Sequence, residues 1–241
     1  MALSFLGDNA DVRSLPGVKL NVVMGRNAGW LTAASALARQ HADDGPHLIY
    51  LPERTFSVER FVADVAAVQA RLGRCICAIS EGIHNERGEL IAASNEVDSH
   101  GNVQLSGSGA LGDRLSATLK AHLGDKLRVR ADTFGYAQRS FPGVASEVDA
   151  REAREAGRAA LRAATGGEHL NGSIALLRNS NAPYSVRYER VELRSVARET
   201  RPMESELIRG DNDVAPAFLD YVRPLVGELP QLARLSDFPV S

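Results

Sequence analysis

The sequence has 241 residues, 44% hydrophobic and 24% charged, which is typical of a globular protein that folds in water. Its 28 basic and 30 acidic residues give a formal net charge of -2, and this balance argues against a protein that binds nucleic acid through a basic face. No apolar run approaches the roughly 20 residues that span a bilayer. The first residues also lack the basic start and long apolar run of a secretory signal, so we expect a cytosolic protein.

Short apolar runs alternate along the chain with longer stretches whose apolar residues recur at helical spacing. Strands are predicted over residues 18–23, 47–51, 74–80, 127–134, 172–178 and 185–193. Helices are predicted over residues 29–40, 57–73, 110–124, 146–164 and 215–226, and residues 81–108 are expected to form a long polar loop. Strands separated by helices indicate βαβ units. The predicted fold class is therefore α/β, with a mostly parallel sheet between two layers of helices.

Two local features refine these elements. Ser57 is a plausible N-cap for the helix over 57–73, although Arg60 in the third position leaves the capping box incomplete. Cys75 and Cys77 lie inside an apolar strand, where we expect buried thiols and neither a disulfide nor a metal pair.

In open parallel sheets, ligands bind beyond the carboxyl ends of the strands. The first strand is followed by "MGRNAGW", in which Gly25 and Gly29 permit a tight turn and Arg26 is presented at the start of a helix. An arginine in that position could hold an anion or a sugar phosphate. The alternative is a surface arginine in an ordinary strand-to-helix loop.

The second strand is followed by "LPERTFS", where Pro52 stops the strand and Glu53 comes directly after it. A carboxylate at this place can accept hydrogen bonds from sugar hydroxyls. The alternative, which is the commoner case, is a solvated glutamate of a loop.

A third strand end carries the segment "RVRADTFGYAQRSF". Tyr136 offers a flat ring and a hydroxyl, and Arg139 offers a bidentate fork suited to phosphate. Arg128 and Arg130 alternate onto one strand face. The alternative is a packed strand with its arginines turned outward, but several arginines around one sheet favour a phosphorylated ligand.

The segment "GSGALG", Gly107 to Gly112, matches the G-x-G-x-x-G fingerprint of dinucleotide-binding folds, and Asp132 follows at about the required distance. The run before the glycines, "HGNVQLS", is a poor buried strand, and the fingerprint lies late in a polar loop. An oxidoreductase that binds NAD through Gly107–Gly112 is therefore a less favoured alternative.

Taken in order, "VVMGRNAGW", "LPERTFS" and "RVRADTFGYAQRS" resemble the fructose 6-phosphate half of 6-phosphofructokinases. The tryptophan of the first segment and the tyrosine of the third are more similar to the pyrophosphate-dependent branch of that family. The segments "QLSGSGALGD" and "SEVDAREAREAGRAA" resemble the same branch, so the resemblance runs from about Val18 to Gly227.

The resemblance implies transfer of a phosphoryl group to O1 of fructose 6-phosphate, a step of glycolysis and gluconeogenesis. It implies that Met24, Gly25 and Arg26 line the sugar-phosphate pocket and that Glu53 binds sugar hydroxyls. Tyr136 and Arg139 would hold the sugar phosphate. Arg130 would reach the substrate of a neighbouring subunit, which implies a homo-oligomer.

One departure from the family is large. The Gly-rich "GGDxPGLN" loop that holds the donor phosphate is absent from this sequence, as is the "TIDND" segment that supplies the base and the neighbours of Mg²⁺. Residues 1–17 do not resemble that half, so we divide the chain into a non-matching segment, 1–17, and a phosphofructokinase-like substrate-binding portion, 18–241.

The chain is therefore expected to be the second part of a phosphofructokinase, with its catalytic base and Mg²⁺ ligands in the part that it lacks. It would bind fructose 6-phosphate and use pyrophosphate or ATP only if that part were supplied. The alternative from another class is a non-catalytic protein that binds fructose 6-phosphate or regulates another enzyme.

Overall fold

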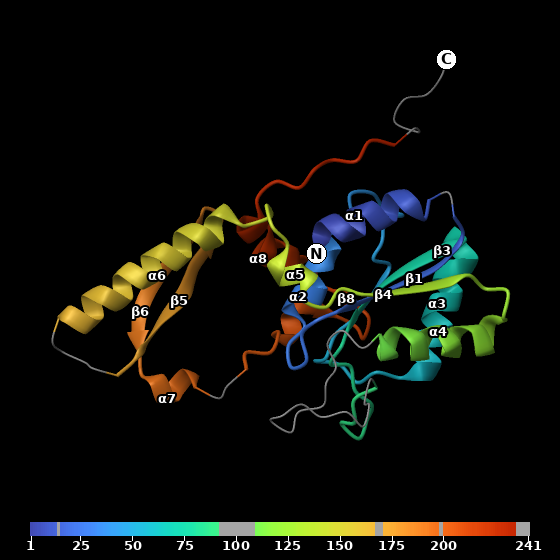
Figure 1. Cartoon of the computed structure of the whole chain (residues 1–241), viewed down its shortest axis with the longest axis horizontal. Helices are drawn as coiled ribbons and strands as arrows, with labels where there is room; N and C mark the ends of the chain where they lie inside the picture. The colour runs from blue at the N-terminus through green and yellow to red at the C-terminus, as the bar shows by residue number, and fades with distance from the viewer. Residues whose placement is uncertain (14, 92–108, 167–170, 198–199, 235–241) are drawn as a thin grey trace, which may run out of the picture. The chain divides into compact units, whose positions relative to one another are not determined.

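The computed structural model describes residues 1–13, 15–91, 109–166, 171–197 and 200–234. The chain divides into two compact units, drawn in Figure 1. The first unit comprises residues 1–141, 202–218 and 230–241, and the second comprises 142–201 and 219–229. The proposed boundary after residue 17 concerns resemblance to a family and stays a prediction.

The first unit is built on a 4-stranded sheet with the order β2-β3-β1-β4, in which every neighbouring pair is parallel. Its strands are β1 (Gly17–Val23), β2 (Leu48–Tyr50), β3 (Arg74–Ser80) and β4 (Val129–Thr133). The long helices α3 (Val58–Leu72) and α4 (Ala110–Leu123) cover one face, and α1 (Ala2–Asp11) lies on the other (Figure 1). The predicted α/β class with a mostly parallel sheet is confirmed.

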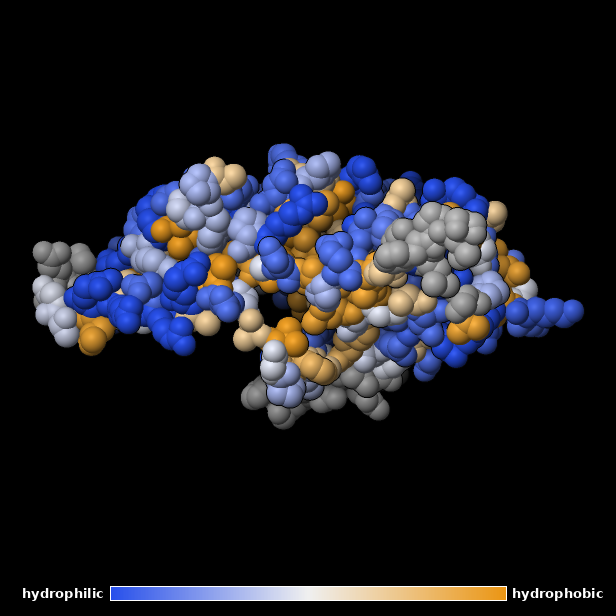
Figure 2. Space-filling view, turned by 90° about the horizontal axis from the view of Figure 1, so that it is seen from above, coloured by the Kyte–Doolittle hydropathy of each residue, from blue (hydrophilic) through white to orange (hydrophobic). Residues whose placement is uncertain are grey.

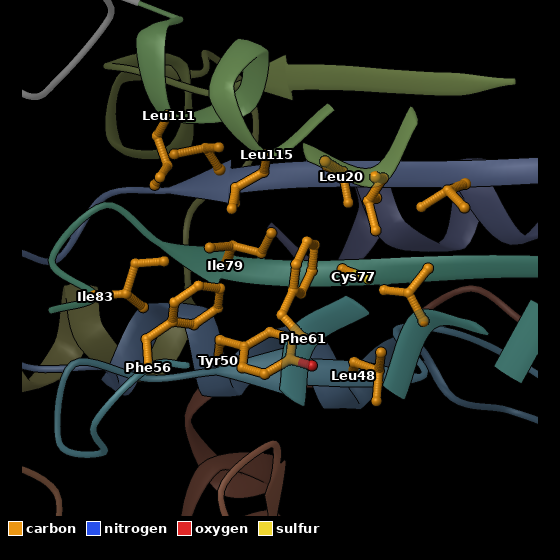
Figure 3. Close-up of a cluster of buried hydrophobic side chains, with 14 of the residues drawn as sticks. Leu20, Leu48, Tyr50, Phe56, Phe61, Cys77, Ile79, Ile83, Leu111 and Leu115 are labelled. Carbon is orange, nitrogen blue, oxygen red and sulfur yellow. The ribbon is translucent and has the colours of Figure 1, made fainter. Parts of the chain in front are cut away.

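The core of this unit lies between the sheet and helices α3 and α4. Alternate residues of β1 and β3 point into it, and the aromatic rings of Tyr50, Phe56 and Phe61 pack edge to face or tilted beside them (Figure 3). Each large apolar side chain buried in this way contributes about 1.5–3 kcal/mol to stability. Cys75 and Cys77 belong to this core as free, buried thiols, as predicted.

Both ends of α3 are set by residues with known capping preferences. The Ser57 hydroxyl accepts a hydrogen bond from the Arg60 backbone N–H at 3.2 Å, which satisfies one of the first amides of the helix. Gly73 ends the helix in the left-handed region, at a φ of 69°, where a side chain is disfavoured. The predicted N-cap is therefore confirmed.

The helix predicted over 29–40 is instead a short α2 (Trp30–Ala33) followed by the 3-10 helix η1 (Ala34–Ala38). The Ser35 hydroxyl donates to the Thr32 carbonyl oxygen at 2.6 Å. Thr32, Ser35 and Ala38 are all buried, and this spacing of three residues suits a 3-10 helix. Helix α1 was not predicted, because in it only Phe5, Leu6 and Asn9 are buried.

After the second unit the chain returns to the first and covers the outer edge of β2. The Ile49 N–H donates to the Asn212 carbonyl oxygen at 2.8 Å, and Arg39 pairs with Asp213 at 2.8 Å. This returning segment holds the 3-10 helix η2 (Ser205–Leu207) and the antiparallel strands β7 (Ile208–Arg209) and β8 (Asp213–Val214). The returning segment therefore hydrogen-bonds to the edge of β2, which would otherwise be open to pairing with another strand.

The second unit places α6 (Glu147–Thr165) beside an antiparallel hairpin of β5 (Ser173–Asn181) and β6 (Tyr184–Val191). Two short helices remain: α7 (Leu193–Val196) in this unit, and α5 (Ala137–Ser140) in the first. The boundary between the two units falls within helix α8 (Pro216–Val226), after Phe218. The strands over 172–178 and 185–193 were predicted, but they form their own sheet.

Arg178 of β5 contacts side chains of β6 and α8 within the second unit. The Arg178 guanidinium lies 3.9 Å from the ring centre of Tyr221 and 4.9 Å from that of Tyr184. The Tyr184 hydroxyl donates to Glu152 of α6 at 2.6 Å. Burial, with this hydrogen bond, raises the pKa of Tyr184 to about 12. Cation–π contacts of this kind contribute about 0.5–2 kcal/mol each.

Among the helices that the structure describes, none has both the length and the apolar character needed to cross a bilayer.

An ion-pair network near the carboxyl end of the described chain predicts acid sensitivity. Arg234 pairs with Asp43 at 2.6 Å and with Asp44 at 2.5 Å, and Arg74 pairs with Asp43 at 2.6 Å. The hydrogen bond from Arg234, opposed by some burial and aided by Arg74, lowers the pKa of Asp43 to about 2. Because this pKa is lower in the folded state, the stabilisation is complete above pH ~4 and is lost as the pH falls towards 2.

We therefore expect Asp43→Asn to lower the free energy of unfolding at pH 7 and to flatten its fall between pH 4 and 2.5. Urea unfolding followed by circular dichroism across this range measures both effects. Asp125→Asn, at an exposed turn position, is the matched control and should follow the wild type. Equal acid dependence in the wild type and Asp43→Asn would contradict the assignment.

Candidate functional site

The carboxyl ends of the parallel strands gather the predicted site residues at one edge of the sheet. The turn from Met24 to Gly29 follows β1, and Glu53 follows β2. Tyr136 and Arg139 follow β4, which pairs directly with β1. The register continues past the sheet, because the Phe134 N–H donates to the Val22 carbonyl oxygen at 3.1 Å. The edge therefore brings six of the predicted residues to one end of the sheet, and Arg130 is the exception.

The turn that presents Arg26 is held against the end of β3. Gly25 adopts a φ of 134°, and its N–H donates to a carboxylate oxygen of Glu81 at 3.2 Å. The Ser80 hydroxyl donates to the Gly25 carbonyl oxygen at 2.8 Å. A Cβ atom on Gly82 would lie only 1.9 Å from the Arg26 carbonyl oxygen, so this approach requires glycine. The turn therefore has little freedom at Gly25 and Arg26.

Glu53 fixes the far end of the same turn. Its Oε1 atom accepts a hydrogen bond from the Gly29 N–H at 2.8 Å and another from the Met203 N–H at 2.9 Å. Its Oε2 atom is buried and accepts no hydrogen bond from the described residues. In this structure the carboxylate binds the backbone amides of the far end of the turn and of the returning segment.

Tyr136 and Arg139 form a small exposed pair beyond β4. Gly135 turns the chain with a φ of 49°, and Tyr136 caps the four-residue helix α5. The Arg139 guanidinium lies 4.7 Å from the centre of the Tyr136 ring, and the ring itself is 59% exposed. Stacking on a ring orients the guanidinium plane and leaves its N–H groups open to an anion.

Arg130 lies towards the other end of β4. It pairs in register with Lys19 near the start of β1, and its guanidinium is 3.8 Å from the Asp11 carboxylate at the end of α1. Arg130, Arg128 and Lys19 line a small cleft there. The structure therefore does not bring Arg130 to the strand ends of its own chain.

The dinucleotide fingerprint lies partly outside the described residues, since Gly107 and Ser108 are not among them. Gly109 is the N-cap of α4 with a φ of 71°. Asp132, expected to bind a ribose hydroxyl, forms an ion pair with Lys19. Because Lys19 is bound to the Asp132 carboxylate, a ribose hydroxyl would have to compete with Lys19 for it.

The strand ends do not fit a magnesium site. Mg²⁺ requires near-octahedral oxygen ligands, usually with one or two carboxylates turned towards it. Here the Glu53 and Glu81 carboxylates accept backbone N–H groups, and no cluster of three metal-ligating side chains occurs among the described residues.

Sequence reasoning missed the contribution of β3 and of Met203. Ser80 is the last residue of the strand predicted over 74–80, and Glu81 and Gly82 directly follow it, so the strand-end rule would have selected all three. Glu81 and Gly82 were instead assigned to the polar loop over 81–108. Met203 had no local signal, because its contact with Glu53 joins positions 150 residues apart in sequence.

The chain is similar to known proteins over most of its length. The sequence model of the family described as "Phosphofructokinase" matches residues 10–164. The chain is 53% identical over 243 residues to a pyrophosphate–fructose 6-phosphate 1-phosphotransferase of Rhodospirillum rubrum, an alignment that covers 98% of this chain and 59% of that protein. It is 38% identical over 218 residues to the enzyme of the same name from Xanthomonas campestris, covering 89% of this chain and 50% of that protein.

A solved structure shows the same fold. The crystal structure of a pyrophosphate-dependent phosphofructokinase from Marinobacter aquaeolei superposes with a TM-score of 0.79 at 26% identity. The superposition covers 96% of this chain and 55% of that one. The chain thus spans between half and three-fifths of the length of these relatives.

The close approach at Gly82 generates a prediction. We expect Gly82→Ala to push the Arg26 carbonyl away and to cost about 1–3 kcal/mol of stability, as overpacking does. Thermal unfolding measures the loss, and backbone amide chemical shifts of Gly25 and Arg26 report the displaced turn. Gly7→Ala is the matched control, because a Cβ at Gly7 of α1 meets nothing within 4 Å. Unchanged shifts in Gly82→Ala would show that the turn tolerates a side chain there.

Proposed function

Because the chain belongs to the phosphofructokinase family, we propose that its strand-end site binds fructose 6-phosphate as the acceptor of a phosphoryl group. One observation carries the proposal. The turn that presents Arg26 and the pair Tyr136–Arg139 follow adjacent parallel strands, β1 and β4, and so share one edge of the sheet. In this proposal both arginines serve one ligand, because bidentate guanidinium groups favour phosphate.

In this proposal Arg139, stacked on Tyr136, binds the phosphate of the sugar. Met24, Gly25 and Arg26 line the sugar, with the turn fixed by Ser80 and Glu81. Glu53 accepts from the Gly29 N–H through one oxygen, and its other oxygen, which has no hydrogen bond from the described residues, would accept one from a sugar hydroxyl. The site therefore binds and orients the acceptor, and orientation is a large part of what catalyses phosphoryl transfer.

Pyrophosphate is the favoured donor, because the relatives with the highest identities above are named for it. Transfer needs groups that hold the donor phosphates and a base for the sugar hydroxyl. Mg²⁺, whose ligands the family resemblance assigns to segments not found in this sequence, would neutralise charge on the donor phosphates. The sequence contains neither the glycine-rich donor loop nor the aspartate segment of the family. We infer that this chain supplies the acceptor site and that the rest of the machinery must come from elsewhere.

Arg130 supports a homo-oligomer in this scheme. Its guanidinium is more than half exposed and lies away from the strand-end site of its own chain. An arginine placed there is available to the ligand of a second copy. The runner-up function is a non-catalytic binder of fructose 6-phosphate, which needs the same acceptor site and no donor.

Isothermal titration calorimetry of the chain with fructose 6-phosphate tests the acceptor site. Arg139→Ala should weaken binding roughly 10- to 100-fold, because it removes a hydrogen-bonded charge from the phosphate. Arg194→Ala, an exposed arginine of α7, is the matched control, and NAD is the control ligand. Saturable NAD binding without sugar-phosphate binding would overturn the proposal in favour of the glycine fingerprint.

An activity assay distinguishes a chain that only binds the acceptor from a complete enzyme. With Mg²⁺ and either pyrophosphate or ATP, we expect the purified chain to form no fructose 1,6-bisphosphate above background, because donor positioning is missing. The full-length Rhodospirillum rubrum enzyme is the positive control, and Arg139→Ala identifies any activity of a contaminant. Magnesium-dependent turnover that Arg139→Ala abolishes would contradict this expectation.

A further inference from the structure

We propose that the second unit is a docking surface for the donor-binding part of a phosphofructokinase, which pairs with the outer edge of β5 and covers the apolar side chains beside it. The partner is a polypeptide that carries the glycine-rich donor loop and the aspartate segment that this sequence lacks. The identity of the partner rests on the proposed function, whereas the uncovered surface is a feature of the second unit itself.

The described residues of the second unit form almost no apolar core. Among them, Val222 of α8 is the one apolar side chain that is buried, and Glu152 of α6 is the one charged side chain that is buried. Figure 2 shows hydrophobic side chains among the hydrophilic ones at the surface of the molecule. Because helices and sheets must bury their apolar faces against another element, this unit has the character of one part of a larger core. Its exposed large apolar side chains are Val144, Leu161, Leu176, Leu193, Val196 and Val226.

Strand β5 has the sequence of an interior strand but lies at an edge. Residues 173–177, with the sequence SIALL, carry no charge and place apolar side chains on both faces of the strand. Such runs are typical of strands that are covered on both faces. Among the described strands, however, β5 pairs with β6 alone, and no residue of β5 is buried. A two-stranded sheet is marginal by itself, so the sequence of β5 favours a further partner strand.

The other strand of the hairpin has the character of a free edge. Arg187 and Glu189 of β6 are exposed and pair with each other at 3.4 Å. Charged side chains on an edge strand oppose pairing with another chain. Residues 173–177 of β5 have no such protection. The two strands therefore differ, and β5 is the edge that suits an added strand.

A groove between β5 and α6 adjoins this edge. Leu176, which is 44% exposed, lies on the same face of β5 as Ile174, which lines the groove. Leu161, which is 65% exposed, lies one helical turn past Gly157, which lines the groove from α6. The strand edge, the groove and the two leucines thus offer a partner one continuous apolar surface. The remaining side chains of α6 in the groove are small: Ala156, Ala160, Ala163 and Ala164.

The extent of the relatives identifies the occupant of this surface. The superposition with the Marinobacter aquaeolei enzyme covers 96% of this chain, so it includes most of the second unit, but it covers only 55% of that enzyme. The alignment with the Rhodospirillum rubrum enzyme likewise covers 59% of that protein. In these relatives the counterpart of the second unit therefore belongs to a much longer chain. A second copy of this chain would bring another acceptor portion and no donor site, so the donor-binding part is the occupant that also completes the machinery of phosphoryl transfer.

Hydrogen exchange of the chain alone tests whether the surface is uncovered. We expect the β5 amides that β6 does not bind to exchange at nearly the rate of an open chain, at every protein concentration. Sedimentation of the wild type and of Leu176→Lys should give the same mass, because contacts between copies do not use this edge. Slow exchange at β5, together with a smaller mass in Leu176→Lys, would overturn the proposal by assigning the edge to a second copy.

Co-expression tests docking in the absence of any sugar phosphate. The probe is the segment of the Rhodospirillum rubrum enzyme that the alignment with this chain leaves out, and the full chain carries an affinity tag. We expect the segment to copurify with the chain, and the outer β5 amides to exchange about 100-fold more slowly in the complex, because they gain strand partners. Leu176→Lys should lower the copurified amount about tenfold or more, since docking would bury an unpaired charge.

Two further variants locate the contact. Leu161→Lys, on the α6 side of the groove, should weaken copurification as Leu176→Lys does. Leu3→Lys is the matched control, because Leu3 of α1 is similarly exposed, at 40%, and lies outside the second unit. A segment that stays insoluble or unbound beside the wild-type chain would overturn the proposal. Equal losses in Leu3→Lys and Leu176→Lys would also overturn it, because binding would then not depend on the β5 surface.

Calorimetry with fructose 6-phosphate separates docking from the acceptor site. Binding of the sugar phosphate by a chain that captures no donor segment would overturn the docking proposal and leave the proposed function in place. Copurification by a chain that binds no sugar phosphate would leave the docking surface in place and remove the proposed function.

Discussion

The close approach of the Arg26 carbonyl oxygen to Gly82 is the constraint on which the site depends. It brings the turn after β1 against the end of β3, where Ser80 and Glu81 bind Gly25 through its two backbone groups. A parallel sheet makes this contact available, because adjacent strands end side by side. At the other end of the same turn, the Gly29 N–H donates to the Glu53 carboxylate.

The direction of β4 divides its functional side chains into two groups. Arg130 lies near the start of the strand and Tyr136 just beyond its end. Between them lie the rest of β4 and the turn at Gly135, so Arg130 is kept away from the strand-end residues of its own chain.

The sequence was informative where structure is local and uninformative where it is not. The hydrophobic periodicity was sufficient to predict β1, β3 and α3, and Ser57 was sufficient to predict the N-cap of α3. These features depend on residues that are neighbours in the sequence. The strands β5 and β6 were found, but their antiparallel pairing was missed, although parallel strands would need a much longer connection than Ala182 and Pro183. The contact between Glu53 and Met203 could not be predicted, because no pattern within either segment refers to the other.

The charged side chains at the strand ends are oriented in two ways, although the formal net charge of the chain is -2. Glu53 and Glu81 turn their carboxylates towards backbone N–H groups, while Arg139 remains exposed on the ring of Tyr136. The carboxylates thus face the backbone and hold the turn, and the Arg139 guanidinium faces outward. The inward carboxylate and the outward guanidinium are therefore two parts of one electrostatic arrangement.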